Sequence, residues 1–213
     1  MASDIKYNIL DSARREMCKP LAHFKDEFYL AGGTGLALQL GHRISEDFDF
    51  FTSKQFDHSH LLKRVAEVFP HHDIQQLQHA KQTLTLMVNE VKISFFCLEP
   101  ESMLPLCESE YFRIASVQEI GVSKLLALFR AAYKDYVDLY FILKMHTLND
   151  LFLLARKKYP GIDESLYLKA LLSYDDVDLF PIQYVEGYET APTVIFESLQ
   201  RHVDQYLKGM SRA

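Results

Sequence analysis

The chain has 213 residues, of which 48% are hydrophobic and 24% are charged, and its formal net charge at pH 7 is −6. This composition is typical of a folded globular protein and excludes collagen, coiled coil and intrinsic disorder. No run of 18 or more apolar residues occurs, so no membrane-spanning helix is expected. The negative charge argues against broad, charge-driven binding of nucleic acid, but a local basic patch could still hold one.

The cysteines and the N-terminal sequence indicate where the chain resides. Cys18, Cys97 and Cys107 are odd in number, and no two of them form a Cys-x-x-Cys pair. The first residues lack the charged segment and apolar stretch of a secretory signal. We therefore expect reduced thiols and a cytoplasmic location.

The first half of the chain is predicted to be a mixed α/β region. Helical spacing of apolar residues predicts a helix over 4–27, which Pro20 should interrupt. An apolar run at 28–31 ends in two glycines and predicts a buried strand, followed by a helix over 34–40 that Gly41 caps. The elements expected next are a strand at 47–51, a helix at 57–69 and a hairpin made of 84–88 and 91–95.

The second half is predicted to be helical almost throughout. Ser116 and Glu119 form a Ser-x-x-Glu capping box ahead of an apolar run. Further helices are expected at 135–146, 149–158, 163–173 and 192–208. The fold class is therefore α+β, with residues 1–115 forming an α/β core and residues 116–213 a helical domain packed against it.

Two acidic residues in the second predicted strand form the first candidate site. Residues i and i+2 of a strand point to one face, so Asp47 and Asp49 should project together. Two such carboxylates repel one another unless a cation lies between them. Mg²⁺ fits this role because it takes one or two carboxylates and completes its shell with phosphates and water. Taken alone, an Asp-x-Asp pair is more typical of the solvated face of an edge strand.

A glycine turn forms the second candidate site. Gly32 and Gly33 lie between a predicted strand and a predicted helix, where backbone N–H groups can approach a phosphate closely. The hydroxyl of Thr34 could donate a further hydrogen bond. A plain strand-to-helix turn with Thr34 as the N-cap is the alternative interpretation.

Lys124 and Asp135 form the third candidate site, in the helical half. Lys124 lies within an apolar helical stripe, so its ammonium either reaches solvent or binds an anion such as a triphosphate. In the second case, Lys124→Met should leave the fold at least as stable. In one unbroken helix Lys124 and Asp135 would lie about 16 Å apart. A shared role therefore requires a break near 131–134, and Asp135 is otherwise interpreted as a helix N-cap, with Asp138 as its partner.

The sequence resembles the AbiEii-type nucleotidyltransferases, toxins of type IV toxin–antitoxin and abortive-infection systems within the DNA polymerase beta-like superfamily. The resemblance lies in FYLAGGTGLALQLGHR at 28–43, SEDFDFF at 45–51, KLLALFR at 124–130 and KDYVDLY at 134–140. It implies a nucleotidyltransferase fold, an NTP substrate, a tRNA or another cellular acceptor, and an antitoxin encoded by a neighbouring gene. Carried onto this chain, it assigns metal binding to Asp47 and Asp49. It assigns nucleotide binding to Gly32, Gly33, Thr34 and Lys124, and a catalytic role to Lys124 and Asp135.

One position departs from the pattern of this superfamily. Its members commonly carry a third acid on a later strand, and the matching residue here is Ser94. Two alternatives to an active enzyme on a nucleic-acid acceptor therefore stay open. One is a catalytically silent nucleotide-binding module, and the other is a transferase that modifies a protein hydroxyl. The basic runs at 63–64 and 156–158 are interpreted as solvated helix faces.

Overall fold

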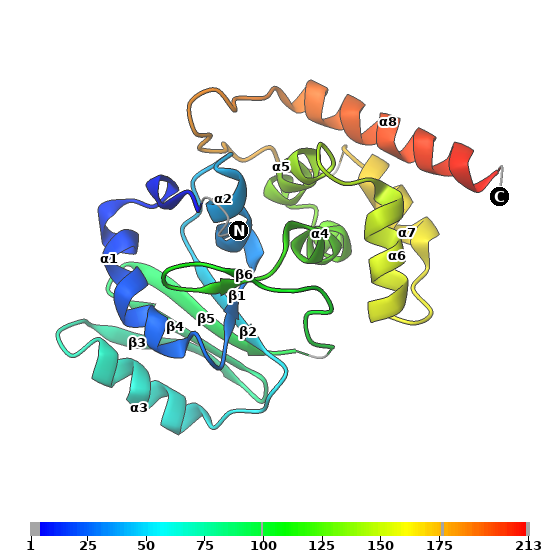
Figure 1. The fold of residues 1–213 in the computed structure, drawn as a ribbon. Coiled ribbons are helices and arrows are strands. Elements are labelled where there is room, and N and C mark those ends of the chain that lie inside the picture. Colours follow the sequence, from blue (N-terminus) through cyan, green and yellow to red (C-terminus); the bar gives the residue numbers. More distant parts are fainter. Residues whose placement is uncertain (1–4, 99, 176, 212–213) are drawn as a thin grey trace. The chain divides into compact units, whose positions relative to one another are not determined.

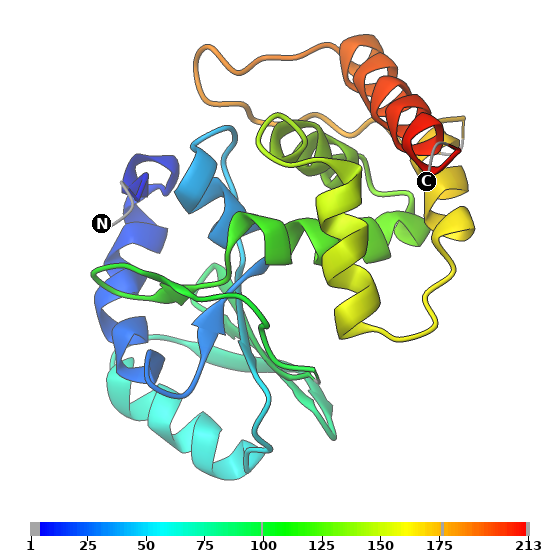
Figure 2. The same cartoon turned by 45° about the vertical axis from the view of Figure 1, so that its right-hand side comes forward.

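The computed structural model describes residues 5–98, 100–175 and 177–211 (Figure 1). The chain divides into two compact units, Met1–Ser116 and Val117–Ala213. The first combines a sheet with helices, and the second is built of helices, as Figure 2 also shows. Within the described ranges, no helix combines the length and the apolar character needed to cross a membrane.

The first unit is organised around one seven-stranded mixed sheet with the order β3-β4-β5-β2-β1-β7-β6. Its strands are β1 (Tyr29–Leu30), β2 (Phe48–Thr52), β3 (Ile74–Ala80), β4 (Thr83–Val88), β5 (Val91–Cys97), β6 (Cys107–Glu108) and β7 (Arg113–Ile114). β2 pairs in parallel with β5, and β1 with β7, whereas the other neighbours are antiparallel. The predicted α+β class is confirmed.

Short helical segments flank this sheet. They are η1 (Tyr7–Ile9), α1 (Ser12–Leu21), η2 (Ala22–Phe24), α2 (Gly32–Leu40) and α3 (His58–Val68). The single long helix predicted over 4–27 is therefore wrong, although Pro20 does lie where α1 ends and a 3₁₀ turn follows. Gly41 caps α2 as predicted, since its φ is +71° and its N–H donates to the Ala37 carbonyl.

One face of the sheet carries an aromatic core. Phe48, Phe50 and Phe95 are at most 1% exposed, and the rings of Phe50 and Phe95 stack at 5.5 Å. Phe24 of η2 packs its ring 5.3 Å from that of Phe95, and the Arg64 guanidinium of α3 lies over Phe24. Because strand residues alternate, this core forces the residues between the β2 phenylalanines to the opposite face.

The hairpin is confirmed, but strand β3 was missed. β4 and β5 pair in antiparallel register around a turn at Asn89, whose φ is +50°. β3 lies at one end of the described sheet, and its residues Gln75–Gln78 are exposed. An edge strand without an alternating apolar face gives no periodic signal in the sequence.

The second unit contains α4 (Val117–Leu126), η3 (Ala127–Arg130), α5 (Tyr133–Ile142), α6 (Leu148–Lys158), α7 (Glu164–Leu172) and α8 (Pro192–Met210). These elements agree with the helices expected from the sequence to within a few residues. A Cβ at Gly121 of α4 would lie 2.9 Å from Leu151 Cδ2 of α6, so the glycine permits these two helices to approach closely. Ala131, with φ of +49°, ends η3 in a left-handed conformation. The break expected near 131–134 is therefore confirmed.

Candidate functional site

Asp47 and Asp49 lie on one face at the start of β2. Phe48 and Phe50, which alternate with them, are 0% and 1% exposed on the aromatic face. Both aspartates are partly exposed. The structure thus brings the two carboxylates to one accessible face of the sheet, which is the arrangement that the Asp-x-Asp spacing predicts.

The glycine turn lies directly against this acidic pair. Gly32 has a φ of +62°, and a Cβ built on it would lie 2.7 Å from Asp49 Oδ2. The Ala31 N–H donates to the Asp49 carbonyl at 3.0 Å, which ties the turn to β2. Only a residue without a side chain fits this position, because any other would meet both backbone strain and the carboxylate. α2 begins at Gly32, so its first N–H groups, which lack intrahelical acceptors, start beside the carboxylates.

Thr34 is not the N-cap, so that interpretation is wrong. Ala31 occupies the N-cap position of α2, and Thr34 lies within the first turn, 1% exposed. Its hydroxyl donates to the Asp47 carbonyl and lies 2.9 Å from the Ser45 hydroxyl. Thr34 therefore holds α2 against the acidic strand, while the backbone N–H groups of that turn are the groups suited to an anion.

A basic side chain that sequence analysis did not assign to the site lies against Gly33. A Cβ at Gly33 would lie 2.6 Å from Arg43 Nη2 and 3.1 Å from Ser45 Oγ. Arg43 is 6% exposed, and its Nη1 donates to the Ile44 carbonyl at 2.9 Å. The second glycine thus leaves room for a guanidinium against the turn, and this adds positive charge beside the first turn of α2.

Lys92 is a second residue that sequence analysis did not assign to the site. Its Nζ lies 2.7 Å from Asp47 Oδ2, and both side chains are more than a third exposed. The hydrogen bond to Asp47 raises the pKa of Lys92, although burial partly opposes it, and the charges of Asp47 and Asp49 add to the rise. The sequence signal is indirect, because Lys92 precedes Ser94 by two residues and only the pairing of β5 with β2 sets it level with Asp47.

Ser94 lies where the sequence comparison placed the missing acid. It pairs in register with Asp49, is 2% exposed, and its hydroxyl lies 3.4 Å from that of Thr85. Over the described residues, no group of three or more histidine, cysteine or acidic side chains is arranged to hold a metal. The two half-buried aspartates still suit Mg²⁺, which needs few protein carboxylates when phosphates and water complete its shell.

In the second unit, Lys124 and Asp135 do meet. The break at Ala131 lets α4 and α5 bring Lys124 Nζ to 2.7 Å from Asp135 Oδ1 and 2.6 Å from Asp138 Oδ2. Arg130 Nη2 lies 2.8 Å from the other oxygen of Asp135, while its own side chain is 64% exposed. Both aspartates are fully buried. Lys124 is thus neither a solvent-reaching chain nor an isolated cation, since its charge is balanced by two carboxylates of its own unit.

This geometry corrects the expected effect of Lys124→Met. The variant would leave two buried carboxylates without their shared ammonium, so it should destabilise the fold rather than leave it as stable. Asp135 lies in the first turn of α5, but Ala132 holds the N-cap position and no side chain caps it. The interpretation of Asp135 as an N-cap is therefore wrong.

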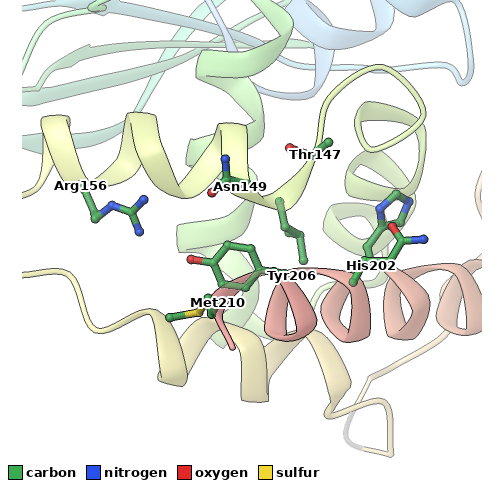
Figure 3. Close-up of a pocket in the computed structure, with 9 residues that line it drawn as sticks. Thr147, Asn149, Arg156, His202, Tyr206 and Met210 are labelled. Carbon is green, nitrogen blue, oxygen red and sulfur yellow. The ribbon is translucent and has the colours of Figure 1, made fainter. Parts of the chain in front are cut away.

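A separate hollow of about 630 Å³ lies on the second unit, between α6 and the C-terminal half of α8 (Figure 3). It is lined by Thr147, Leu148, Asn149, Arg156, His202, Gln205, Tyr206, Gly209 and Met210. Arg156 is ion-paired with Glu164, whose carboxylate also accepts from the Tyr206 hydroxyl. None of the residues predicted for the site lines this hollow.

The basic run at 156–158 is only partly a solvated helix face. Lys158 is 7% exposed at its side chain and lies 2.6 Å from the buried carboxylate of Glu119. Arg156, whose side chain is 44% exposed, pairs with Glu164, so two of the three basic charges have acidic partners. The run therefore does not form a strongly basic patch for nucleic acid.

Comparisons with known proteins agree with this fold. The family model described as "Nucleotidyl transferase AbiEii toxin, Type IV TA system" matches residues 16–209. The uncharacterized protein aq_aa25 of Aquifex aeolicus (strain VF5) is 33% identical over 195 residues, which are 86% of this chain and 90% of that protein.

Two crystal structures have a similar fold. A candidate nucleotidyltransferase from H. pylori superimposes with a TM-score of 0.64 at 22% identity, covering 95% of this chain and 98% of that one. JHP933 from Helicobacter pylori gives a TM-score of 0.62 at 20% identity, covering 98% of this chain and 95% of that one. Because the family model spans nearly the whole chain, the protein belongs to the AbiEii nucleotidyltransferase toxin family.

Proposed function

We propose that the protein is a Mg²⁺-dependent nucleotidyltransferase that moves a nucleotide from an NTP to a hydroxyl of a cellular acceptor. The observation that carries this proposal is the close approach of the glycine turn to the acidic pair, with the Gly32 Cβ position 2.7 Å from Asp49 Oδ2. A helix N-terminus beside two same-face carboxylates is suited to a phosphate chain that shares a cation with those carboxylates.

The residues of the first unit would act mainly by positioning and charge. Asp47 and Asp49 would hold Mg²⁺, which when bound neutralises charge on the triphosphate. The N–H groups at Gly32 and Gly33 would bind phosphate oxygens, and Thr34 would keep α2 in place through its bond to the Asp47 carbonyl. The acceptor oxygen then forms a bond to the α-phosphorus, the bond to pyrophosphate breaks, and the hydroxyl proton passes to a base.

The residues of the second unit are assigned more restricted roles. Lys124, whose charge two carboxylates already balance, would hold Asp135 in position, and Asp135 would in turn orient the Arg130 side chain for a substrate group. Both oxygens of Asp135 are already engaged, by Lys124 and by Arg130. This arrangement favours orientation over proton transfer for Asp135. Because Ser94 is not an acid–base group at neutral pH, another group, such as water or the substrate itself, would accept the proton of the acceptor hydroxyl.

The family description, a nucleotidyltransferase toxin of a type IV toxin–antitoxin system, supports a toxin with an antitoxin partner. A tRNA acceptor is proposed from the sequence resemblance alone. Two other functions rest on specific observations. Ser94 beside Asp49 favours a nucleotide-binding module without transfer. The net charge of −6 and the neutralised basic run favour a protein acceptor over RNA.

Transfer of label from α-labelled NTPs, with Mg²⁺, total RNA and cell extract, tests the proposal. The parent should label an acceptor, Asp49→Asn should not, and the control Asp26→Asn, an exposed aspartate, should behave as the parent. Labelled protein instead of RNA would identify a protein acceptor. If folded parent protein binds NTP in a thermal-shift assay but labels nothing, the silent module replaces the enzyme.

A further inference from the structure

The acidic pair already has a cation of its own. Lys92 Nζ lies 2.7 Å from Asp47 Oδ2, the distance of a charge-assisted hydrogen bond. An oxygen bound to Mg²⁺ lies 2.0–2.1 Å from the metal. The ammonium and a divalent cation therefore compete for the Asp47 carboxylate.

The face of the sheet around this pair carries a small net charge. Parallel register sets Asp49 level with Ser94, and Lys92 contacts Asp47, while the Arg43 guanidinium lies against the adjoining glycine turn. The two carboxylates and the two basic groups sum to a formal charge of about zero, which attracts a divalent cation only weakly. A triphosphate would change this balance, because it adds negative charge for both the metal and the ammonium.

Lys92 is able to move between these partners. Its side chain is 39% exposed and that of Asp47 is 37% exposed, so neither is locked by packing. A flexible four-carbon stem with three donors can exchange one oxygen acceptor for another at small cost. Exposed ion pairs of this kind are worth only about 0–1 kcal/mol.

We propose that Lys92 is an internal counterion that occupies Asp47 in the metal-free protein and transfers to a phosphate oxygen when metal and nucleotide bind. This inference rests on the proposed function, because it takes Asp47 and Asp49 as the metal ligands. Its consequence is coupling: Lys92 weakens the binding of the metal alone and strengthens the binding of metal together with nucleotide. Lys92 is thus a residue that makes the site selective for the metal–nucleotide pair.

Binding of Mn²⁺, measured by calorimetry or by the loss of its free electron-resonance signal, tests this without any turnover. Removing a unit charge about 5 Å from a divalent ion in water should tighten metal binding roughly tenfold. Lys92→Met should therefore bind Mn²⁺ about tenfold more tightly than the parent. Lys92→Arg should bind it as the parent does, as should the control Lys63→Met, an exposed lysine of α3.

The second arm adds a non-hydrolysable NTP analogue. The analogue should raise the Mn²⁺ affinity of the parent more than that of Lys92→Met, since only the parent has a Lys92 ammonium that can bind a phosphate oxygen. Equal Mn²⁺ affinity of the parent and Lys92→Met, or an equal gain from the analogue, would overturn the inference. The Asp49→Asn variant separates the two proposals: if it binds Mn²⁺ as well as the parent, or if no protein binds Mn²⁺, the metal site itself is wrong.

Discussion

Replacing Lys124 by methionine should cost the protein a large part of its stability. The ammonium lies 2.7 Å and 2.6 Å from the carboxylates of Asp135 and Asp138, both of which are fully buried. Breaking a buried pair by removing one partner costs about 3–5 kcal/mol, because a buried charge loses its compensation. The total stability of a protein is only about 5–15 kcal/mol. For a chain of this size the loss corresponds to a melting temperature about 6–20 °C lower.

The stability lost in Lys124→Met should come from the uncompensated charges of Asp135 and Asp138 and not from lost packing of the lysine stem. Methionine keeps most of the apolar stem, so packing changes little. Adding Asp138→Asn removes one of the stranded charges, and the double variant should lose less than the sum of the two single variants by about 1–3 kcal/mol. Lys157→Met, an exposed position in the same unit, is the control and should change stability by about 0.5 kcal/mol or less.

Urea and thermal unfolding followed by circular dichroism at 222 nm measure these effects, since the second unit is built of helices. A melting temperature of Lys124→Met within about 2 °C of the parent would refute the reasoning, because 1 kcal/mol corresponds to about 2–4 °C. Additive losses in the double variant would show that Lys124 and Asp138 are not coupled. Either result would mean that the buried cluster does not stabilise the unit through its charges.

Three further predictions concern the backbone and one buried thiol. Gly32→Ala should lower the free energy of unfolding by about 1–3 kcal/mol, because alanine would be strained at φ +62° and would clash with Asp49. Urea titration measures this loss. The variant should also bind Mn²⁺ more weakly than the parent. Ala131→Gly should raise the unfolding free energy by up to about 1 kcal/mol by relieving a left-handed alanine; a lower value in urea would contradict this. Burial raises the pKa of Cys18 from 9.0 to about 12. The stability that this thiol contributes is therefore fully present below about pH 9 and is lost as the pH rises toward 12, so unfolding curves between pH 8 and 11 should be flatter with pH in Cys18→Ala.

The aspartate pair and its turn were predictable because they depend on local geometry. Alternation along a strand puts Asp47 and Asp49 on one face whatever the strand's neighbours are. Two glycines after a strand indicate a close backbone approach from the sequence alone, although the structure places both in the first turn of α2. The helices of the second unit were predicted for a similar reason, since apolar spacing is a property of a single segment.

Other features depend on which segments become neighbours. Lys92 lies beside Asp47 because β5 pairs in parallel with β2, and nothing near Lys92 in the sequence indicates that pairing. The sequence alone indicates that Lys158 lies on a solvated helix face, yet in the structure it pairs with the buried Glu119 of α4. Strand β3 was missed because an edge strand carries no apolar periodicity.

The sequence by itself determined the α+β class, the acidic pair, the glycine turn and the need for a chain break before Asp135. It could not determine how the charges balance, because a partner across a sheet or between helices is set by packing over long sequence separations. Only the tertiary structure decided that Lys124 is held by Asp135 and Asp138 and that Asp47 already has Lys92 as its counterion. The physical reason is that strand alternation and helical period act within one segment, whereas ion pairs depend on distances between segments.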